Sequence, residues 1–169
     1  MVWFTADQHF FHDAAPTFKG REFSSLEEMH KAIIEKWNLV VEPTDTIYVL
    51  GDYCFGTDIK ALKEVTSALH GAKILIMGNH DTFSYRQYVN CGFKKVYDLP
   101  VVLANDLILS HEPLLGITGD GMYNIHGHTH GRPFTLQSSK HYCVSLECNS
   151  MRPVSYNELQ KLKYLGGNT

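Results

Sequence analysis

The chain has 169 residues, of which 44% are hydrophobic and 20% are charged, and its formal net charge is −3. This composition is typical of a single globular domain over residues 1–169 and excludes a disordered chain. The 15 Lys and Arg residues form no basic run beyond Lys94-Lys95, which argues against a platform for duplex nucleic acid.

The cysteines and the first residues bear on location. The four cysteines, at positions 54, 91, 143 and 148, show no CxxC pairing, so we expect reduced thiols and a cytoplasmic protein. The apolar run before Asp7 is too short for a signal peptide or a membrane span, so we expect no membrane partner. The sequence does not indicate an oligomeric state.

Strands and helices are predicted to alternate in the first half. Short apolar runs at 2–6, 46–51 and 73–78 are typical of buried strands. A helix is expected after Ser24-Ser25, where Glu27 and Glu28 can complete a capping box, and it should end before Pro43. A second helix is expected from Asp58 to Gly71, and a short third one after Asp81.

The second half is expected to be richer in strands. The runs at 101–104 and 107–110 predict a hairpin that turns at Asn105-Asp106, and 123–127 predicts another strand. A final helix should begin at Ser155, where Glu158 completes a capping box, and run towards Tyr164. This order predicts an α/β protein with layered sheets and a more antiparallel second half.

Polar residues of a restricted kind follow five of these strands. Taken one at a time they are ordinary turn residues. Ligands nevertheless gather at the carboxyl ends of strands in α/β sheets, where residues far apart in sequence can converge. The candidates, from the stretches DQH, GD, GNHD, SHEP and GHTH, are Asp7, His9, Asp52, Asn79, His111, His128 and His130.

These residues offer carboxylate, amide and imidazole donors and no thiolate. That mixture suits divalent ions such as Mn²⁺, Fe²⁺ or Zn²⁺ rather than a structural zinc held by cysteines. Seven ligands are too many for one ion and suit two. Two ions about 3.5–4 Å apart form a clamp for in-line displacement at phosphorus and acidify a bridging water.

The motifs DxH, GD, GNHD, a later single histidine and GHxH, in this order, resemble those of the calcineurin-like metallophosphoesterase superfamily. The chain looks most similar to the small single-domain members from bacteria and phages, and the resemblance runs from residue 2 to about residue 155. It implies a four-layer α/β/β/α sandwich with the metal site at the carboxyl ends of the strands. It also implies a phosphoesterase that uses two divalent ions, with Mn²⁺ as first choice and Fe, Zn, Ni or Mg as alternatives.

The resemblance also assigns roles by position. The first metal would be held by Asp7, His9, Asp52 and His130, and the second by Asp52, Asn79, His111 and His128, so that Asp52 bridges them. Asn79 and His80 would contact the substrate, and His80 would assist the leaving oxygen after attack by a metal-bridging hydroxide. Asp81 would orient the His80 imidazole.

The sequence leaves several substrates and functions open. The chain is short and has no obvious cap insertion, which favours a small phosphodiester of the nucleotide type. A phosphomonoesterase acting on nucleotides or other small phosphates is the alternative. A non-catalytic binding module of the same fold and a nuclease are further alternatives, against which stand the intact His80 and the lack of a basic groove respectively.

Three further residues are candidates for supporting roles. His12, just after the first motif, could reach a phosphate, or could lie in a solvated loop. Arg21 could clamp a phosphate through its fork-shaped guanidinium, or could be a plain surface arginine. His126, which precedes the GHTH motif at alternating spacing, is expected to support the ligands from the end of its strand rather than to bind metal.

Overall fold

The first sheet is predominantly parallel. We analysed a computed structural model that describes residues 1–103, 106–116, 121–134 and 139–164. The strand order is β4-β3-β2-β1-β9, and only the pairing of β1 with β9 is antiparallel. The strands are β1 (Val2–Thr5), β2 (Thr46–Leu50), β3 (Ala72–Ile76), β4 (Phe93–Tyr97) and β9 (Val154–Ser155).

The second sheet combines parallel and antiparallel pairing. Its strands are β5 (Val101–Leu103), β6 (Leu107–Leu109), β7 (Tyr123–His126) and β8 (His141–Cys143), in that order. Only β5 and β6 form the antiparallel pair of the expected hairpin, whereas β6, β7 and β8 are mutually parallel. Both antiparallel pairings of the described strands, β5 with β6 and β9 with β1, involve strands of the second half, so the expectation of a more antiparallel second half is confirmed, although most of this sheet is parallel. The sequence separations between β6, β7 and β8, 110–122 and 127–140, exceed the dozen or so residues that a connection between parallel strands requires.

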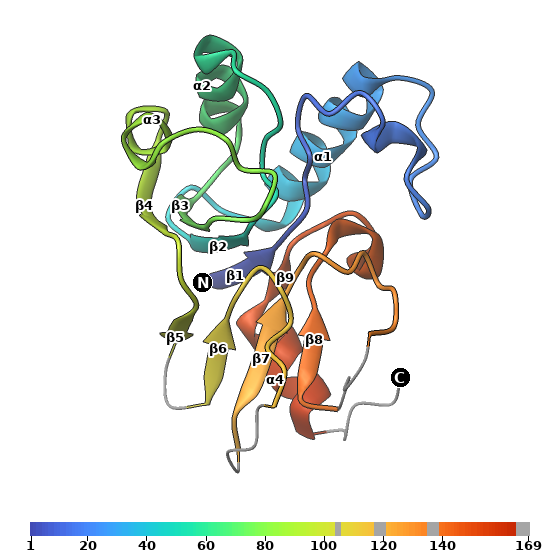
Figure 1. The fold of residues 1–169 in the computed structure, drawn as a ribbon, viewed down its shortest axis with the longest axis vertical. Helices are drawn as coiled ribbons and strands as arrows, with labels where there is room; N and C mark the ends of the chain where they lie inside the picture. Colours follow the sequence, from blue (N-terminus) through green and yellow to red (C-terminus); the bar gives the residue numbers. More distant parts are fainter. Residues whose placement is uncertain (104–105, 117–120, 135–138, 165–169) are drawn as a thin grey trace.

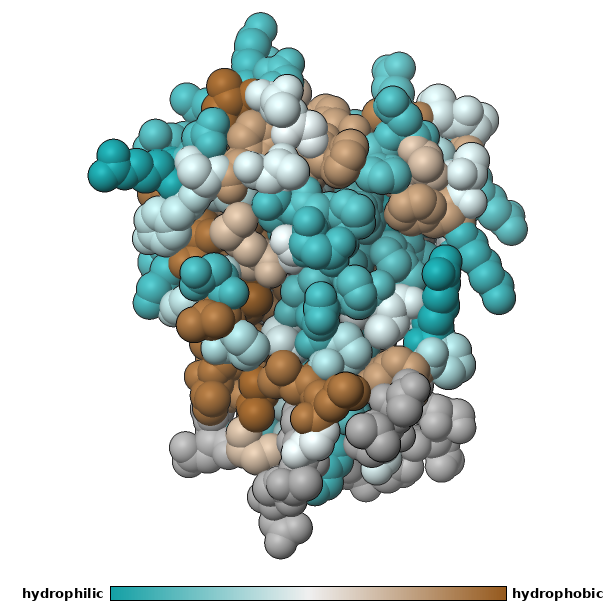
Figure 2. Space-filling model, viewed as in Figure 1, coloured by the Kyte–Doolittle hydropathy of each residue, from teal (hydrophilic) through white to brown (hydrophobic). Residues whose placement is uncertain are grey.

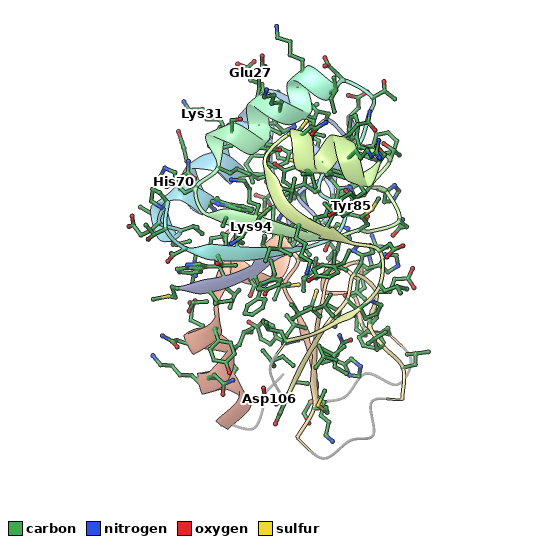
Figure 3. All side chains as sticks on the ribbon, turned by 90° about the vertical axis from the view of Figure 1, so that its left-hand side faces the viewer. Glu27, Lys31, His70, Tyr85, Lys94 and Asp106 are labelled. Carbon is green, nitrogen blue, oxygen red and sulfur yellow. The ribbon has the colours of Figure 1, made fainter. Side chains whose placement is uncertain are left out.

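Helices flank the two sheets. Helices α1 (Leu26–Val40), α2 (Ile59–Ala68) and α3 (Tyr85–Asn90) cover the first sheet, and α4 (Tyr156–Tyr164) lies behind the second (Figure 1). In the orthogonal view, Glu27 and Lys31 mark the helical end of the molecule and Asp106 marks the opposite end (Figure 3). Two short 3₁₀ helices, η1 (Ala15–Thr17) and η2 (Leu146–Asn149), complete the described elements.

The helix boundaries follow the predicted capping residues. The Ser25 hydroxyl accepts from the amide of Glu28, and the Asp58 carboxylate accepts from two amides in the first turn of α2. Ser155 and Glu158 form the predicted capping box of α4. Helix α2 ends at Ala68, earlier than predicted. The predicted hairpin turn lies partly outside the described residues, since 104–105 are not included.

Two hydrophobic clusters separate the layers. Successive residues of β1 face opposite sides of the sheet, as in any strand, so that Trp3 joins one cluster and Phe4 the other. The first cluster packs α1 and its neighbours against the first sheet, with Trp37 fully buried. The second cluster lies between the sheets and joins Phe4 to Leu109 and Ile125. The α/β/β/α layering expected from the sequence is confirmed, and it holds the strand ends of both sheets against each other.

Candidate metal centre

All seven predicted ligands follow directly on strands of the two sheets. The first sheet supplies four from the loops after β1, β2 and β3, and the second sheet supplies three from the loops after β6 and β7. Hydrophilic side chains cross the middle of the molecular face on which the two sheets meet (Figure 2). The loops place the ligands in two groups, in which Asp7, His9 and His130 form the first and Asp52, Asn79, His111 and His128 the second.

The first group combines one carboxylate and two imidazoles. His9 Nε2 lies 3.3 Å from His130 Nε2, and the latter lies 3.8 Å from Asp7 Oδ1. Asp7 and His9 are buried, while His130 is half-buried. Their facing donor atoms lie within 4.8 Å of one another, close enough to share one metal ion.

The second group has the same character with an added amide. His111 Nε2 lies 2.9 Å from Asn79 Oδ1 and 3.1 Å from His128 Nδ1, and Asn79 Oδ1 lies 3.0 Å from His128 Nδ1. The carboxylate of this group comes from Asp52, whose Oδ1 lies 3.4 Å from His111 Nε2. The three histidine and amide donors thus converge on one point.

Asp52 lies between the groups. Its Oδ2 is 3.6 Å from His9 Nε2 in the first group, while its Oδ1 faces His111 in the second. Each oxygen of one carboxylate is therefore directed towards a different group. This is the arrangement in which a carboxylate can bridge two metal ions.

The backbone of the ligand loops is strained. Five of the ligand residues adopt a left-handed conformation, with φ of 61° at Asp7, 51° at His9, 52° at Asp52, 64° at His128 and 50° at His130. Residues other than glycine rarely adopt this region, and each instance costs roughly 1–3 kcal/mol. The surrounding sheets must therefore hold these residues in place.

Glycines allow the ligand loops to approach one another. A Cβ added at Gly78 would lie 2.3 Å from Asp52 Oδ1, and one added at Gly127 would lie 2.7 Å from Asp7 Oδ2. Neither distance is possible for a real side chain. The glycines of the GNHD and GHTH motifs are therefore required by close packing against the carboxylates.

The electrostatics of the site are those of crowded acids and imidazoles. Burial raises the pKa of Asp7 to about 7 and lowers the pKa of His9 to about 3. Burial also acts on the pair of Asp52 and His111, but their mutual attraction outweighs it, lowering the pKa of Asp52 to about 2 and raising that of His111 to about 9. Buried carboxylates need a compensating cation. The side chains that face the carboxylates of Asp7 and Asp52 as ion-pair partners are imidazoles. The donor set therefore fits divalent metal ions.

His80 and Asp81 occupy different surroundings. The His80 amide donates to Asp52 Oδ1 at 2.9 Å, and its half-buried ring lies 5.4 Å from that of His9. The Asp81 carboxylate accepts from the backbone amides of Asp52, Tyr53 and Gly78 at 2.8–3.0 Å and from the hydroxyl of Tyr88. Asp81 was predicted to orient the His80 ring, but the hydrogen bonds of its carboxylate in the described structure go to other groups. Asp81 instead anchors the backbone of two ligand loops.

Arg21 corrects another expectation. Its guanidinium is buried, donates to the backbone carbonyls of Asp7 and Gln8, and pairs with Glu147, whose Oε1 lies 2.5 Å from Arg21 Nε. Arg21 is neither a phosphate clamp nor a surface arginine, because its donors are directed at protein acceptors. Sequence reasoning missed Glu147, which no motif marks.

His12 and His126 are the two remaining candidate histidines from the sequence. His12 packs edge-on against the rings of His9 and Phe55, with centroids 5.4 and 4.7 Å apart, so it is close to the site. His126 is buried at the end of β7, and its Nδ1 donates to the carbonyl of Gly127 at 2.9 Å. His126 is thus a residue of the strand end, as expected, and lies outside both donor groups.

An open cleft of 780 Å³ borders both groups. Its lining includes His9, Asp52, His80, His128 and His130, together with the cations Lys19 and Arg132. A second hollow of 470 Å³ adjoins it along His128, Arg132 and Pro133. Small-molecule sites commonly have volumes of about 300–1,000 Å³.

Two stacked sheets with paired nitrogen and oxygen donor groups at their strand ends define an α/β protein built to hold two metal ions. The model of the calcineurin-like phosphoesterase family matches residues 1–161, and the chain belongs to that family. The family and the two groups indicate a metal-dependent phosphoester hydrolase with a dinuclear divalent-metal site.

Relatives extend over most of the chain. An uncharacterized protein of Methanocaldococcus jannaschii, MJ1445, is 33% identical over 95% of this chain and 90% of its own length. The gene 66 protein of Mycobacterium phage L5 is 28% identical over 83% of this chain and 82% of its own length.

Two solved structures share the fold. A protein of unknown function from Aquifex aeolicus, AQ665, superimposes with a TM-score of 0.75 and 26% identity, covering 96% of this chain and 98% of that one. The nuclease MPE of Pseudomonas putida has a TM-score of 0.53 and 21% identity, covering 76% and 61%. In the described part of this chain, no helix has the length and apolar character needed to span a bilayer.

Proposed function

We propose that this chain hydrolyses small phosphodiesters of the nucleotide type with two divalent metal ions. The observation that carries the proposal is the convergence of two donor groups on either side of Asp52, beside an open cleft. The proposal includes a single domain over residues 1–169 and a cytoplasmic location, where the four free cysteines would stay reduced.

The donor set supports the choice of metal. In this proposal Asp52 would be shared by the two ions, the first of which Asp7, His9 and His130 would hold, and the second Asn79, His111 and His128. Imidazole nitrogens combined with carboxylate and amide oxygens suit Mn²⁺, our first choice, as well as Fe, Zn, Ni and Mg. When bound, such a pair supplies positive charge to the phosphate oxygens and an acidified water.

His80 is proposed as the residue that contacts the phosphate and protonates the leaving oxygen. Its backbone is fixed by the hydrogen bond to Asp52, while its ring lines the cleft beside His9. Asn79 would contact the substrate from the same loop. The ring of His12 lies 6.0 Å from that of His80, and we propose that it supports the orientation of this ring.

The shape of the cleft supports a diester. The phosphate of a diester carries two organic ester groups. The two hollows that adjoin at His128 and Arg132 offer one space for each of these groups. Arg132 lines both hollows and Lys19 lines the larger one, so both could contact phosphate oxygens. Arg132 would take the phosphate-clamping role for which Arg21 was one of the candidates from the sequence.

The test compares hydrolysis of bis(p-nitrophenyl) phosphate and p-nitrophenyl phosphate with Mn²⁺, Ni²⁺, Zn²⁺ and Mg²⁺. We expect faster turnover of the diester, and a loss of kcat on the order of 10²–10⁴-fold in His80→Ala, because general acid catalysis has that magnitude. His70→Ala is the matched control, since His70 Nδ1 donates to the carbonyl of Val41 outside the cleft. This control should keep wild-type turnover.

Other results would redirect the proposal. Faster hydrolysis of the monoester would favour a phosphomonoesterase, and full activity of His80→Ala would remove the role of that residue. No turnover of either ester by protein loaded with two ions would favour a binding module. Cleavage of single-stranded oligonucleotides would favour a nuclease, and fewer than two ions per chain at saturating metal would contradict the dinuclear site.

A further inference from the structure

We infer that Glu147, held in place by Arg21, is a positioning residue that fixes the orientation and the ligating nitrogen of His130 in the first donor group. The inference rests on the proposed metal-binding role of that group. It concerns two residues that no sequence motif marks, and it assigns a function to the buried ion pair between them.

The contact with His130 defines which nitrogen is free. Glu147 Oε1 lies 3.0 Å from His130 Nδ1. A carboxylate oxygen can only accept, so Nδ1 carries the proton and donates it in this hydrogen bond. Nε2 then presents its lone pair, and this is the atom that faces His9 Nε2 and Asp7 Oδ1.

Arg21 fixes the carboxylate in turn. The same oxygen, Glu147 Oε1, lies 2.5 Å from Arg21 Nε, and the side chains of Arg21 and Glu147 are 0% and 5% exposed. The remaining nitrogens of the guanidinium donate to the carbonyls of Asp7 and Gln8. Through this ion pair and its hydrogen bond to His130, Glu147 in η2 connects the loop that carries Asp7 with the loop that carries His130.

The other histidines of the centre are held differently. His111 Nδ1 donates to the backbone carbonyl of Leu50 at 2.9 Å, and His9 Nδ1 is buried with no hydrogen-bond partner among the described residues. Of these three histidines, His130 is the one whose far nitrogen is bound by a charged side chain in the described structure. A carboxylate on the far nitrogen of a metal-binding imidazole fixes its tautomer and raises its basicity, and removing it typically weakens metal binding by about 10–100-fold.

A purely structural ion pair would predict a different outcome. It would affect the stability of the whole protein and both metal sites alike. A positioning role predicts a selective effect on the first site, because the described contacts of Glu147 include no member of the second group. The second site can thus serve as an internal reference.

The experiment is a titration of metal-free Glu147→Gln with Mn²⁺, read by calorimetry and by competition with a chelator. We expect one of the two sites to weaken by about 10–100-fold while the other keeps its wild-type affinity. Glu158→Gln is the matched control: it removes a carboxylate from another Arg–Glu pair, with Arg152 Nη2 at 2.6 Å from Glu158 Oε1, remote from both donor groups. This control should lower stability and leave both affinities unchanged.

A second measurement applies to the wild-type protein itself. Nitrogen-15 NMR of the metal-free chain should show His130 protonated at Nδ1, and Arg21→Lys, which keeps the charge but loses the fork, should weaken the same single site. An unchanged titration in Glu147→Gln, equal weakening of both sites, or a wild-type His130 protonated at Nε2 alone would overturn the inference. These readouts do not depend on turnover. A protein that binds metal but is inactive would therefore refute the proposed function without affecting the inference about Glu147.

Discussion

Replacing Gly78 by alanine should disrupt the second donor group without changing any ligand. The added Cβ would lie 2.3 Å from Asp52 Oδ1, 2.5 Å from the Asp52 amide nitrogen and 2.9 Å from His111 Cε1. Real contacts are essentially never below 3.0 Å, so the Asp52 carboxylate would have to retreat by at least about 0.7 Å. Metal–ligand distances tolerate only about 0.2 Å. We therefore expect affinity for the second ion to fall on the order of 100-fold, with a loss of about 1–3 kcal/mol in the free energy of unfolding from overpacking.

The assay is the number of Mn²⁺ ions retained per chain after dialysis, together with the affinity of each site from chelator competition. Gly56→Ala is the control, because Gly56 has a φ of 133° but nothing within 4 Å of an added Cβ. It should lower stability through backbone strain while keeping both metal sites. Gly78→Ala protein that binds two ions with wild-type affinity would refute the argument from close packing.

Two further predictions concern stability. Asp81→Asn should lower the free energy of unfolding by about 3 kcal/mol in urea, because the new NH₂ group would face amide donors such as those of Tyr53 and Gly78; a change below about 0.5 kcal/mol would contradict this. His30 Nε2 accepts a hydrogen bond from the Phe11 amide, and burial lowers the pKa of His30 to about 4. Between about pH 4 and 6.5, the His30 side chain is therefore protonated in the unfolded chain but not in the native protein. Stability should therefore fall as the pH drops through this range, by about 2 kcal/mol after allowance for partial exposure, and in metal-free His30→Gln this part of the loss should vanish; a parallel pH profile in the variant would exclude His30 as its source.

The sequence was sufficient where the chemistry is concentrated in short motifs. Apolar runs followed by polar residues predicted the strands before Asp7, Asp52 and His111, and the helix caps at Ser25 and Asp58 lie where they were expected. Local signals of this kind depend on a few neighbouring residues, so they survive without knowledge of the tertiary structure.

The remainder depended on contacts between distant parts of the chain. Strand β9 has only two residues, and β8 is the short, mixed stretch His141–Cys143, so neither carries a recognisable periodicity. Arg21 and Glu147 are 126 positions apart, and only folding reveals that they form an ion pair. Asp81 adjoins His80 in sequence, yet its carboxylate turns towards backbone amides, a direction that spacing alone does not specify.

The left-handed conformation of five ligand residues bears on how such a site can change over evolutionary time. Each strained residue is held by the sheets against a cost of roughly 1–3 kcal/mol, so the presentation of Asp7 or His128 is less robust than the fold that supports it. Mutations that loosen the packing between the sheets would release these residues before the chain unfolds. Selection against core mutations should therefore act first through loss of the ligand geometry and only later through loss of the fold. The same motifs placed on another scaffold would need equally rigid strand ends to hold the ligands.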